Sequence, residues 1–505
     1  MPSDGKPPLV LYEDDHLLAI HKPSGINTHK PDRYAQDGIH EWLQKQRPEW
    51  RKLAILHRLD KETSGVMVFG KTTLANKSLT EQFERGQVTK TYLFLTSSQP
   101  KAPTTVISTP IDRKPARTRF RIVEKSGAFT LVEAQPETGR THQVRIHAAE
   151  AGLPILGDKE HGTASMPVPR LMLHAWKLSF RHPQSGQPLE IEAQQPVAFR
   201  NPDPLAIARE LRQLLFDESR ADCYRLIASI ADGFPDLVLD KFGNVLLLQR
   251  FAGNATIPAT IEQLGERHAL FLQEMVSSAK AKPALWHGVE PPAIVATENG
   301  LRFVIRMDQG FSPGLFLDQR ENRRHLRKIA AGKDVLNCFA YTCAFSVTAA
   351  AAGGKTTSVD LSKTYLDWGR ENFRANNLNP DEHDFIYGDV FDWLKRFAKR
   401  GRQWDIVLLD PPSFGTTKKG NVFRAARDYV ELVRLAAKLV KRGGTLFCST
   451  NLRSISAEQF VAGIERAVRD EKRQIASMEF ETQPFDFRVA EGERPYLKTV
   501  WLDLR

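Results

Sequence analysis

The string His57-Arg-Leu-Asp-Lys-Glu-Thr-Ser-Gly65 places a carboxylate between two basic side chains, directly before a turn-forming Thr-Ser-Gly. Neighbouring cations favour the ionised form of a carboxyl group, so Asp60 is expected to stay charged at the mouth of a basic groove. An ionised carboxylate can add to an electrophilic carbon or remove a proton. Since an Arg-x-Asp pair is more often a surface salt bridge, the prediction depends on the motifs that accompany it.

Four further motifs follow in order: Lys90-Thr-Tyr92, Glu137-Thr-Gly-Arg-Thr-His-Gln-Val-Arg-Ile-His147, Pro154-Ile-Leu-Gly-Asp158 and Leu173-His-Ala-Trp176. Together with H-R-L-D-x-x-T-S-G, they resemble the RluA-type pseudouridine synthases over about residues 10–180. The resemblance implies isomerisation of uridine to pseudouridine in RNA, without a cofactor.

The same resemblance implies a role for four side chains. Asp60 is the catalytic aspartate, which acts at the ribosyl C1′ region so that the freed uracil rotates and rejoins through carbon. Tyr92 lies against the target base as a stacking platform or general base, and Arg145 pairs with Asp60. A stacked uracil cannot be reached, so the nucleotide must flip out, and Arg58 fills the space that it leaves.

A second set of carboxylates follows apolar runs in the C-terminal half. The run at 335–339 leads into a loop without G-x-G-x-x-G, and Asp360 follows about 20 residues later, where a doubly wound fold holds ribose hydroxyls. Asp389 and Asp410 come after later runs, where open α/β sheets bind ligands. This pattern favours an adenosine cofactor that has no pyrophosphate.

These residues resemble the class I S-adenosylmethionine-dependent methyltransferases, and more closely the ribosomal RNA group with the RlmI and RlmK types, over about residues 314–505. The resemblance implies S-adenosylmethionine as cofactor. The implied cofactor residues are Phe316, Asp318, Arg320, Asn337, Phe339, Tyr341, Thr342, Asp360, Asp389 and Asp410. The implied substrate residues are Pro411, Pro412, Phe414 and Asn451, with Phe414 stacking on the target base. Many relatives have Gly where Cys343 stands, so a positive φ there would strain this chain.

Two methylated atoms remain open. Carbon methylation of cytosine needs a thiolate that adds to the ring first, whereas guanine N7 has its own lone pair and needs only positioning. Asn451 stands where RlmI-type relatives show the cysteine, and Cys448 lies inside a predicted strand as a core residue. Ser449-Thr-Asn-Leu-Arg453 resembles the RlmK type, which methylates guanine N7. We therefore favour N7 methylation of large-subunit ribosomal RNA over 5-methylcytosine formation.

The elements that position these residues divide at two breaks. Three prolines within residues 194–204 and a second break near residues 282–292 predict domains at 1–200, 205–300 and 301–505. Short β-rich runs in the first domain predict an α+β fold on a mainly antiparallel sheet, and the small second domain is α+β with a hairpin around residues 241–244. In the third, strands alternate with helices, which predicts a parallel, Rossmann-like α/β sheet. One of its helices carries Tyr429, Leu432, Val433, Ala436 and Val440 on one face and is stopped by Gly443-Gly444.

A net charge of +11 favours a polyanionic partner, and nucleic acid more than a membrane. The stretch Arg113–Arg121 joins five cations with one aromatic, Phe120, which suits phosphate contacts and stacking. Four scattered cysteines predict neither disulfides nor zinc, and we expect no metal and a cytoplasmic location. The leading hypothesis is a bifunctional RNA-modifying enzyme. The alternative is a methyltransferase whose N-terminal half only docks RNA.

Overall fold

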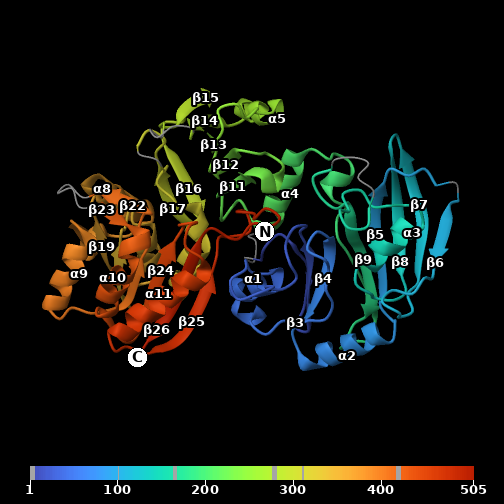
Figure 1. Ribbon diagram of the computed structural model, residues 1–505, viewed down its shortest axis with the longest axis horizontal. Helices are drawn as coiled ribbons and strands as arrows, with labels where there is room; N and C mark the ends of the chain where they lie inside the picture. The colour runs from blue at the N-terminus through green and yellow to red at the C-terminus, as the bar shows by residue number, and fades with distance from the viewer. Residues whose placement is uncertain (1–5, 101, 163–167, 276–280, 310–311, 417–421) are drawn as a thin grey trace. The chain divides into compact units, whose positions relative to one another are not determined.

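A computed structural model describes residues 6–100, 102–162, 168–275, 281–309, 312–416 and 422–505. The chain forms two compact units (Figure 1). Unit 1 comprises Met1–Pro31 and Asp37–Asp217, and unit 2 comprises Asp32–Gln36 and Glu218–Arg505. The division into three domains stays a prediction. None of the helices within the described ranges is both long and apolar enough to cross a bilayer.

Unit 1 is built on one ten-stranded sheet that is mainly antiparallel, as the sequence predicts. Its strands run in the order β1-β2-β4-β9-β5-β8-β7-β6, while β3 pairs with β4 and β10 pairs with β9. The strands are β1 (Val10–Glu13), β2 (Leu17–Lys22), β3 (Ala54–Ile55), β4 (Ser64–Gly70), β5 (Thr89–Thr96), β6 (Thr104–Ile107), β7 (Thr118–Ser126), β8 (Phe129–Pro136), β9 (Leu173–Arg181) and β10 (Pro188–Glu192). The helices are α1 (Ile39–Gln46), α2 (Thr73–Glu84), α3 (Gln143–Glu150) and α4 (Pro204–Leu215).

Helices α2 and α3 pack on different halves of this sheet and bury its apolar side chains. Ala75 and Leu79 of α2 pack on buried residues of β2 and β4. Val144 and Ala148 of α3 pack on Phe94, Phe120 and other residues of β5, β7 and β8. Burial of this apolar surface is the main force that holds β4 and α3 in place. It therefore also positions the segment that precedes each of them.

Gly65 sets the position of the segment that carries the H-R-L-D motif. It has a φ of +121°, and a Cβ there would lie only 2.1 Å from the carbonyl oxygen of Ala175. At this point β4 pairs in parallel with β9, through Ser64 opposite His174 and Gly65 opposite Ala175. Only glycine allows so close an approach of the two backbones. The motif's last residue therefore fixes where Asp60, five residues earlier, leaves the sheet.

Unit 2 begins with a five-stranded sheet in the order β11-β12-β13-β14-β15 and a separate hairpin of β16 and β17. The predicted hairpin is confirmed, because β12 and β13 pair antiparallel from Leu237 opposite Arg250 to Phe242 opposite Val245. The elements are β11 (Cys223–Ala228), β12 (Leu237–Phe242), β13 (Val245–Arg250), α5 (Ala259–Glu262), β14 (Ala269–Glu274), β15 (Ala284–His287), β16 (Ile294–Glu298) and β17 (Leu301–Ile305).

The rest of unit 2 is a seven-stranded sheet in the order β20-β19-β18-β21-β24-β26-β25. Its first five strands are parallel to one another. Strand β26 runs antiparallel to β24, and β25 runs antiparallel to β26. The strands are β18 (Asp334–Cys338), β19 (Lys355–Asp360), β20 (Asp384–Tyr387), β21 (Trp404–Leu409), β24 (Val440–Thr450), β25 (Ile475–Glu481) and β26 (Lys498–Leu504), and a small hairpin is formed by β22 (Phe414–Thr416) and β23 (Val422–Arg424). This arrangement confirms the predicted Rossmann-like fold.

Helices cover both faces of the seven-stranded sheet. They are α6 (Arg320–Ile329), α7 (Ala344–Ala351) and α8 (Lys363–Ala375), and α9 (Val390–Lys399), α10 (Ala425–Ala437) and α11 (Ala457–Asp470). Alternate residues of one strand show the two faces, since Val335 packs in the cluster that contains α6 and α7, and Leu336 in the cluster that contains α9 to α11. The strand order reverses between β18 and β21, which is the point where doubly wound sheets bind ligands.

The predicted end of the helix around residue 433 is wrong. Helix α10 ends at Ala437, and Val440 is the first residue of β24. Gly443 and Gly444 do not stop the helix but lie within β24, where the register with β21 shifts between Val440 and Thr445. A Cβ at Gly444 would come within 2.6 Å of the Asp405 carbonyl oxygen. The glycine pair is thus a bulge in a strand, which local periodicity does not distinguish from a helix stop.

The loop between β18 and α7 carries three non-glycine residues in the left-handed conformation. Phe339, Tyr341 and Cys343 have φ values of 58°, 49° and 60°. The strain expected at Cys343 is therefore present, since the left-handed conformation costs an L-residue about 1–2 kcal/mol. The thiol of Cys343 fills the space over Gly369 of α8, where a Cβ would lie 2.5 Å from Sγ.

This contact predicts a change of sign between two backgrounds. In the native chain, Gly369→Ala should lower the free energy of unfolding by about 1–3 kcal/mol, because the new methyl group overlaps the Cys343 side chain. In a Cys343→Gly background the same substitution should raise it by about 0.5–1 kcal/mol, because alanine favours a helix interior more than glycine does. Denaturant unfolding of the four proteins checks this. A loss of similar size in both backgrounds would contradict the proposed overlap.

Candidate active sites

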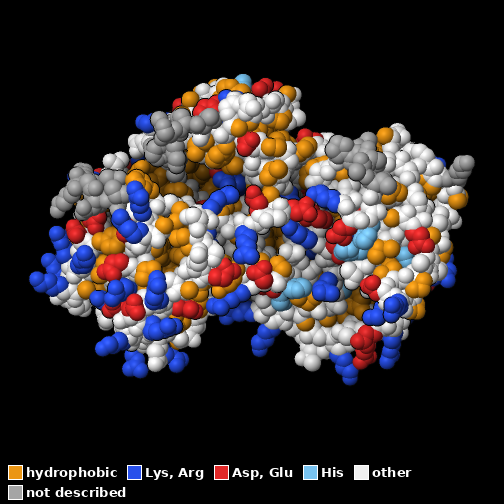
Figure 2. Space-filling model, in the orientation of Figure 1, with side chains coloured by type: hydrophobic (Ala, Val, Ile, Leu, Met, Phe, Trp, Pro, Cys, Tyr) orange, Lys and Arg blue, Asp and Glu red, His pale blue; other side chains and the backbone are white. Residues whose placement is uncertain are grey.

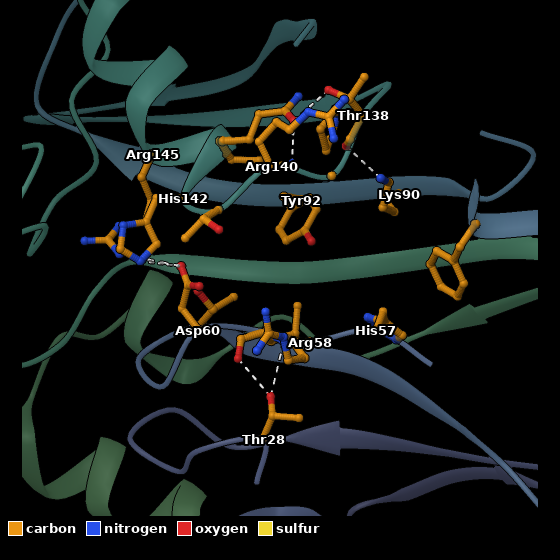
Figure 3. Close-up of a pocket in the computed structure, with 18 of the residues that line it drawn as sticks. Thr28, His57, Arg58, Asp60, Lys90, Tyr92, Thr138, Arg140, His142 and Arg145 are labelled. Atoms are coloured by element: carbon orange, nitrogen blue, oxygen red, sulfur yellow. Dashed lines mark hydrogen bonds and ion pairs between the residues drawn. The ribbon is translucent and has the colours of Figure 1, made fainter. Parts of the chain in front are cut away.

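Unit 1 contains a cavity of about 890 Å³ whose wall includes all four residues that the first resemblance singles out: Arg58, Asp60, Tyr92 and Arg145. They come from different elements, namely the segment before β4, strand β5 and helix α3. Figure 3 shows the ring of Tyr92 between Asp60 and His142 on one side and Lys90 on the other, with Arg58 below it. The fold thus brings together side chains that lie up to 87 positions apart in the chain.

Arg145 is the main cationic neighbour of Asp60. One of its Nη atoms lies 3.5 Å from the Asp60 carboxylate. Its guanidinium group is held by Asp158, which accepts hydrogen bonds of 2.8 and 2.7 Å from Nε and Nη2. The Asp158 side chain is almost fully buried. Burial opposes its ionisation, but the bonds from Arg145 and two backbone N–H groups outweigh this and lower its pKa. Arg145 is therefore fixed before any substrate arrives.

Asp158 ends the motif P-I-L-G-D, to which the resemblance assigns no role. The structure shows that Asp158 holds Arg145 in place. Gly157, which precedes Asp158, has a φ of +77°, and a Cβ there would lie 2.2 Å from the Arg170 carbonyl oxygen. The tight turn therefore requires glycine at position 157, and it places Asp158 beside Arg145. The sequence offered this signal, but the partner of Asp158 could be identified only in three dimensions.

His142 is a second neighbour of Asp60 that the sequence analysis did not select. Its Nε2 lies 3.8 Å from the Asp60 carboxylate, at the same oxygen that faces Arg145. His142 precedes α3 with a φ of 54°, which turns its ring into the cavity (Figure 3). Its place in the motif E-T-G-R-T-H was the available signal.

Tyr92 is half-buried and lines the cavity near this carboxylate. Burial, together with the negative charge of Asp60, raises the pKa of its phenol above the ordinary value. The phenol is therefore protonated at neutral pH. Of the two roles that the resemblance left open, stacking suits this group better than proton removal.

A buried lysine supports the segment that carries Asp60. The ammonium of Lys22 donates to the carbonyl oxygens of Pro23, Ile26 and Lys61, at 3.0, 2.7 and 3.0 Å. Burial lowers the pKa of Lys22 to about 7. The hydroxyl of Thr28 likewise contacts the carbonyl of Leu59 at 2.9 Å (Figure 3). Sequence reasoning missed Lys22, whose only signal is a lone charge at the end of an apolar strand.

The basic stretch at Arg113–Arg121 gives a mixed result. Its cations are exposed, as phosphate contacts require. Phe120, however, is buried and packs edge-to-face on Phe94, with 5.9 Å between ring centroids. The expectation that this aromatic stacks on a base is wrong, because alternation along β7 turns it into the core while the arginines face outward.

Unit 2 carries a second candidate site at the carboxyl ends of its parallel strands. Asp360 ends β19, and its carboxylate accepts hydrogen bonds from the backbone N–H groups of Tyr341, at 2.9 Å, and Ser362, at 2.8 Å. The Tyr341 ring lies among Phe316, Tyr365 and Trp368. Asp360 therefore holds the strained loop after β18 against the next strand, beside an aromatic wall.

Three carboxyl groups of this site are half-buried and have raised pKa values. Burial is the main cause for Asp318, Asp360 and Asp410, and the pKa of Asp410 rises to about 6. Asp318 accepts a hydrogen bond of 2.8 Å from the Tyr496 hydroxyl, and Asp410 accepts one of 3.1 Å from the Gln319 amide. Partly buried carboxyls with raised pKa values stabilise a bound cation and can accept hydrogen bonds from hydroxyl groups.

The remaining predicted cofactor residues have varied surroundings. Asp389 caps α9 by accepting the Asp392 N–H at 3.1 Å, Phe316 is about half exposed, and Phe339 packs against Phe423. Three are engaged by the protein itself: Arg320 forms an ion pair with Asp486, Asn337 donates to Ser346 at 2.9 Å, and Thr342 donates to the Gly314 carbonyl at 2.5 Å. These contacts hold the three side chains in place around the site.

The predicted substrate residues follow β21 and β24. Pro411 is buried, Pro412 is exposed, and Phe414 on β22 is 58% exposed. The amide oxygen of Asn451 accepts a hydrogen bond of 2.6 Å from the Ser413 hydroxyl, so the two segments lie together. Figure 2 shows Lys and Arg side chains gathered over α9 to α11 of this unit, mixed with fewer acidic ones.

All four cysteines of the chain lie in unit 2, and all are buried. Cys448 sits in the middle of the core on β24, as predicted, and burial raises the pKa of its thiol. Such a thiol neither reaches solvent nor ionises near neutral pH.

A doubly wound sheet with acidic residues at its strand ends is the architecture of a nucleotide-cofactor enzyme, and comparison with known proteins narrows the class. The model of the S-adenosylmethionine-dependent methyltransferase family matches residues 247–488, and that of the RNA pseudouridylate synthase family matches residues 16–150. The chain belongs to the S-adenosylmethionine-dependent methyltransferases and carries a pseudouridine synthase domain before the methyltransferase.

The similar proteins agree with this assignment. Ribosomal RNA large subunit methyltransferase I of Erwinia tasmaniensis is 32% identical over 308 residues, which cover 58% of this chain and 78% of that protein. Its counterpart from Shewanella amazonensis is 31% identical with the same coverage. A solved S-adenosylmethionine-dependent methyltransferase from Streptococcus mutans is 27% identical and covers 65% of this chain and 87% of its own, with a TM-score of 0.53.

The raised pKa of the half-buried Asp410 carboxyl predicts a pH-dependent cost to stability. Its pKa is about 6 in the folded chain and 3.8 in the reference state, so the folded state loses stability as pH rises from about 4 to 6 and keeps that loss above 6. Asp410→Asn should therefore raise the free energy of unfolding by up to about 3 kcal/mol at pH 7.5. Near pH 4 the two proteins should be equally stable. Thermal unfolding of the cofactor-free chain at both pH values tests this, and equal stability at pH 7.5 would contradict it.

Proposed function

We propose that unit 1 converts uridine into pseudouridine in RNA, with Asp60 as the catalytic residue. The single observation that supports this most is that Asp60, Tyr92, Arg58 and the fixed Arg145 line one cavity. Arg145 and His142 lie on the same side of the Asp60 carboxylate, at 3.5 and 3.8 Å. They aim the other side of the carboxylate towards the substrate.

In this proposal each of the side chains around the cavity has a different role. The target nucleotide must leave the RNA helix to enter the cavity, and the exposed Arg58 takes its place. Tyr92 supplies a flat, protonated ring for the uracil to stack on. Asp60 attacks the ribosyl C1′ region or removes a proton there, and the glycosidic bond to nitrogen breaks. The uracil rotates and rejoins through C5, which releases Asp60 in its starting form. C5 then loses its proton and N1 gains one, so that the product is an isomer of uridine. Lys22 keeps the Asp60 segment rigid by holding the Lys61 carbonyl.

Replacing Asp60 separates the two activities. Asp60→Asn should abolish pseudouridine formation, since an amide is neither a nucleophile nor a base, and it should leave methyl transfer intact. Asp15→Asn, an exposed aspartate of the same unit, is the matched control and should leave both activities unchanged. Mass spectrometry of nucleosides from a treated RNA transcript measures both products. Pseudouridine formed at the native rate by the Asp60 variant would favour the alternative, in which unit 1 only docks RNA.

We further propose that unit 2 methylates large-subunit ribosomal RNA, as the names of the similar proteins indicate for those proteins. S-adenosylmethionine, which carries a positive sulfonium, supplies the methyl group when bound. The residues that would hold it are Asp318, Asp360, Asp389, Asp410 and the aromatic loop of Phe339–Thr342. These half-buried carboxyl groups suit a cationic ligand, and Asp360 can accept hydrogen bonds from the ribose hydroxyls of its adenosine.

Guanine N7 is the methylated atom that we propose. Attack from C5 of cytosine requires a thiolate to add to the ring, and the four thiols of this chain are buried. N7 has a free lone pair, so the protein needs only to orient the base. The exposed ring of Phe414 can stack on it, and the Asn451 side chain lies beside the same segment through its bond to Ser413.

The methylated nucleoside that forms shows whether guanine N7 or cytosine C5 is methylated. The chain, incubated with S-adenosylmethionine and an unmodified transcript of large-subunit ribosomal RNA, should yield 7-methylguanosine in the nucleoside digest. Cys448→Ala should keep methyl transfer within about twofold, because the thiol serves only packing. Phe414→Ala should reduce it by about 5- to 150-fold, as loss of a stacked base costs about 1–3 kcal/mol. The appearance of 5-methylcytidine, or complete loss of transfer in a folded Cys448→Ala protein, would overturn the N7 proposal.

A further inference from the structure

Two histidines and a glutamate meet beside Asp60 in unit 1. The Nδ1 of His142 lies 3.1 Å from the Nε2 of His161 and 3.1 Å from Oε2 of Glu160. The third side of this triangle, from His161 Nε2 to the same Glu160 oxygen, is 3.6 Å. Three atoms of the kinds that bind metals thus face one point.

These separations are close to those between three corners of a zinc tetrahedron, the two of 3.1 Å being about 0.2 Å shorter. Zinc bonds to nitrogen and oxygen are about 2.0–2.2 Å long, so neighbouring ligand atoms around one ion lie about 3.3–3.6 Å apart. Two imidazoles and one carboxylate, with the fourth position open, form a common protein zinc site. We propose that His142, Glu160 and His161 bind a zinc ion, which departs from the expectation that the chain holds no metal.

The surrounding structure holds the ligands before any ion arrives. Asp158 accepts the backbone N–H groups of Glu160 and His161, each at 3.1 Å, and also binds the guanidinium group of Arg145 on α3. His142 is the residue that immediately precedes the same helix. One buried carboxylate therefore positions both segments that carry the ligands, and little ordering is needed on binding.

The protons and charges are compatible with the ion. In the absence of metal, one of the two facing nitrogens carries the proton of the His142–His161 hydrogen bond. That proton moves to the far nitrogen of its ring, because a neutral imidazole exists in either tautomer. Glu160 Oε2 also accepts from Arg145 at 3.1 Å, and a carboxylate oxygen has lone pairs for both partners.

The site has a consequence for Asp60. With the ion on Nδ1 of His142, the proton of the ring is fixed on Nε2, which lies 3.8 Å from the Asp60 carboxylate. A movement of about 1 Å would then bring the Asp60 carboxylate into a hydrogen bond with this N–H group, as the carboxylate partner of a metal-bound histidine. We expect zinc to inhibit pseudouridine formation, an expectation that rests on the function proposed for Asp60.

A second group in the described part of the chain serves as control. His325, Glu479 and Glu481 of unit 2 also lie close together, but they offer one imidazole, at 4.0 and 3.8 Å from the two carboxylates. The His325 ring is stacked on Trp501, with centroids 4.3 Å apart and planes within 5°. Moving it onto an ion would break that stack.

Calorimetric titration of the full chain with zinc chloride tests the binding. The native chain and His325→Ala should bind one ion with equal affinity. His161→Ala and Glu160→Gln should each weaken binding by more than about 100-fold, since loss of a ligand exceeds the roughly 10–100-fold effect of an outer partner. His161→Gln is a milder variant in case His161→Ala does not fold. No binding by the native chain, or equal binding by native chain and His161 variants, would overturn the site.

The inhibition is measured separately, as the rate of pseudouridine formation with and without zinc chloride, each protein being compared with its own zinc-free rate. The native rate should fall at zinc concentrations that fill the site, and the His161→Gln rate should not. Zinc that binds to the native chain without slowing it would overturn the link to Asp60. A native chain that forms no pseudouridine even without zinc would overturn the proposed function of unit 1, while the titration still decides the metal site.

Discussion

The arrangement of unit 1 around its cavity depends on the buried pairing of Arg145 with Asp158. A charged group away from water is stable only when it is paired and hydrogen-bonded, and here both conditions are met by two short bonds and two backbone N–H groups. Removing Arg145 would leave the buried Asp158 carboxylate without its cation, which costs about 3–5 kcal/mol. The same pair joins α3 to the turn at Gly157, so it orients Asp60 and positions Glu160 and His161 at once.

In unit 2, the loop of the candidate cofactor site is held in place by steric fit and not by a buried ion pair. This loop keeps three side chains in the left-handed conformation, at Phe339, Tyr341 and Cys343, where glycine would be relaxed. The loop persists because the surrounding structure holds it. The Asp360 carboxylate binds the Tyr341 N–H, and the missing Cβ of Gly369 leaves room for the Cys343 thiol. Strain in one loop is thus offset by contacts in two neighbouring elements, as is common around ligand sites.

The sequence predicted the parts of this structure that depend on local patterns. The class of both sheets, the hairpin around residue 243, and the burial of Cys448 follow from alternation, turn residues and strand context, and Asp60, Tyr92, Arg58 and Arg145 were named because their motifs occur together. It did not predict what depends on partners distant in the chain. The burial of Lys22 under the Asp60 segment and the pairing of Arg320 with Asp486 arise only when the strands assemble. The burial of Phe120 and the bulge at Gly443 show that composition alone does not assign a face or a register.

The placement of the four cysteines gives unit 2 a built-in reporter. Because each thiol is buried and burial raises the pKa of each, alkylating reagents in water meet neither an accessible sulfur nor a thiolate in the folded chain. Labelling must then wait for local or global opening of unit 2, and its rate under native conditions measures that opening. Unit 1 contains no cysteine and contributes nothing to the signal, so one reagent can follow the methyltransferase unit alone within the intact two-unit chain.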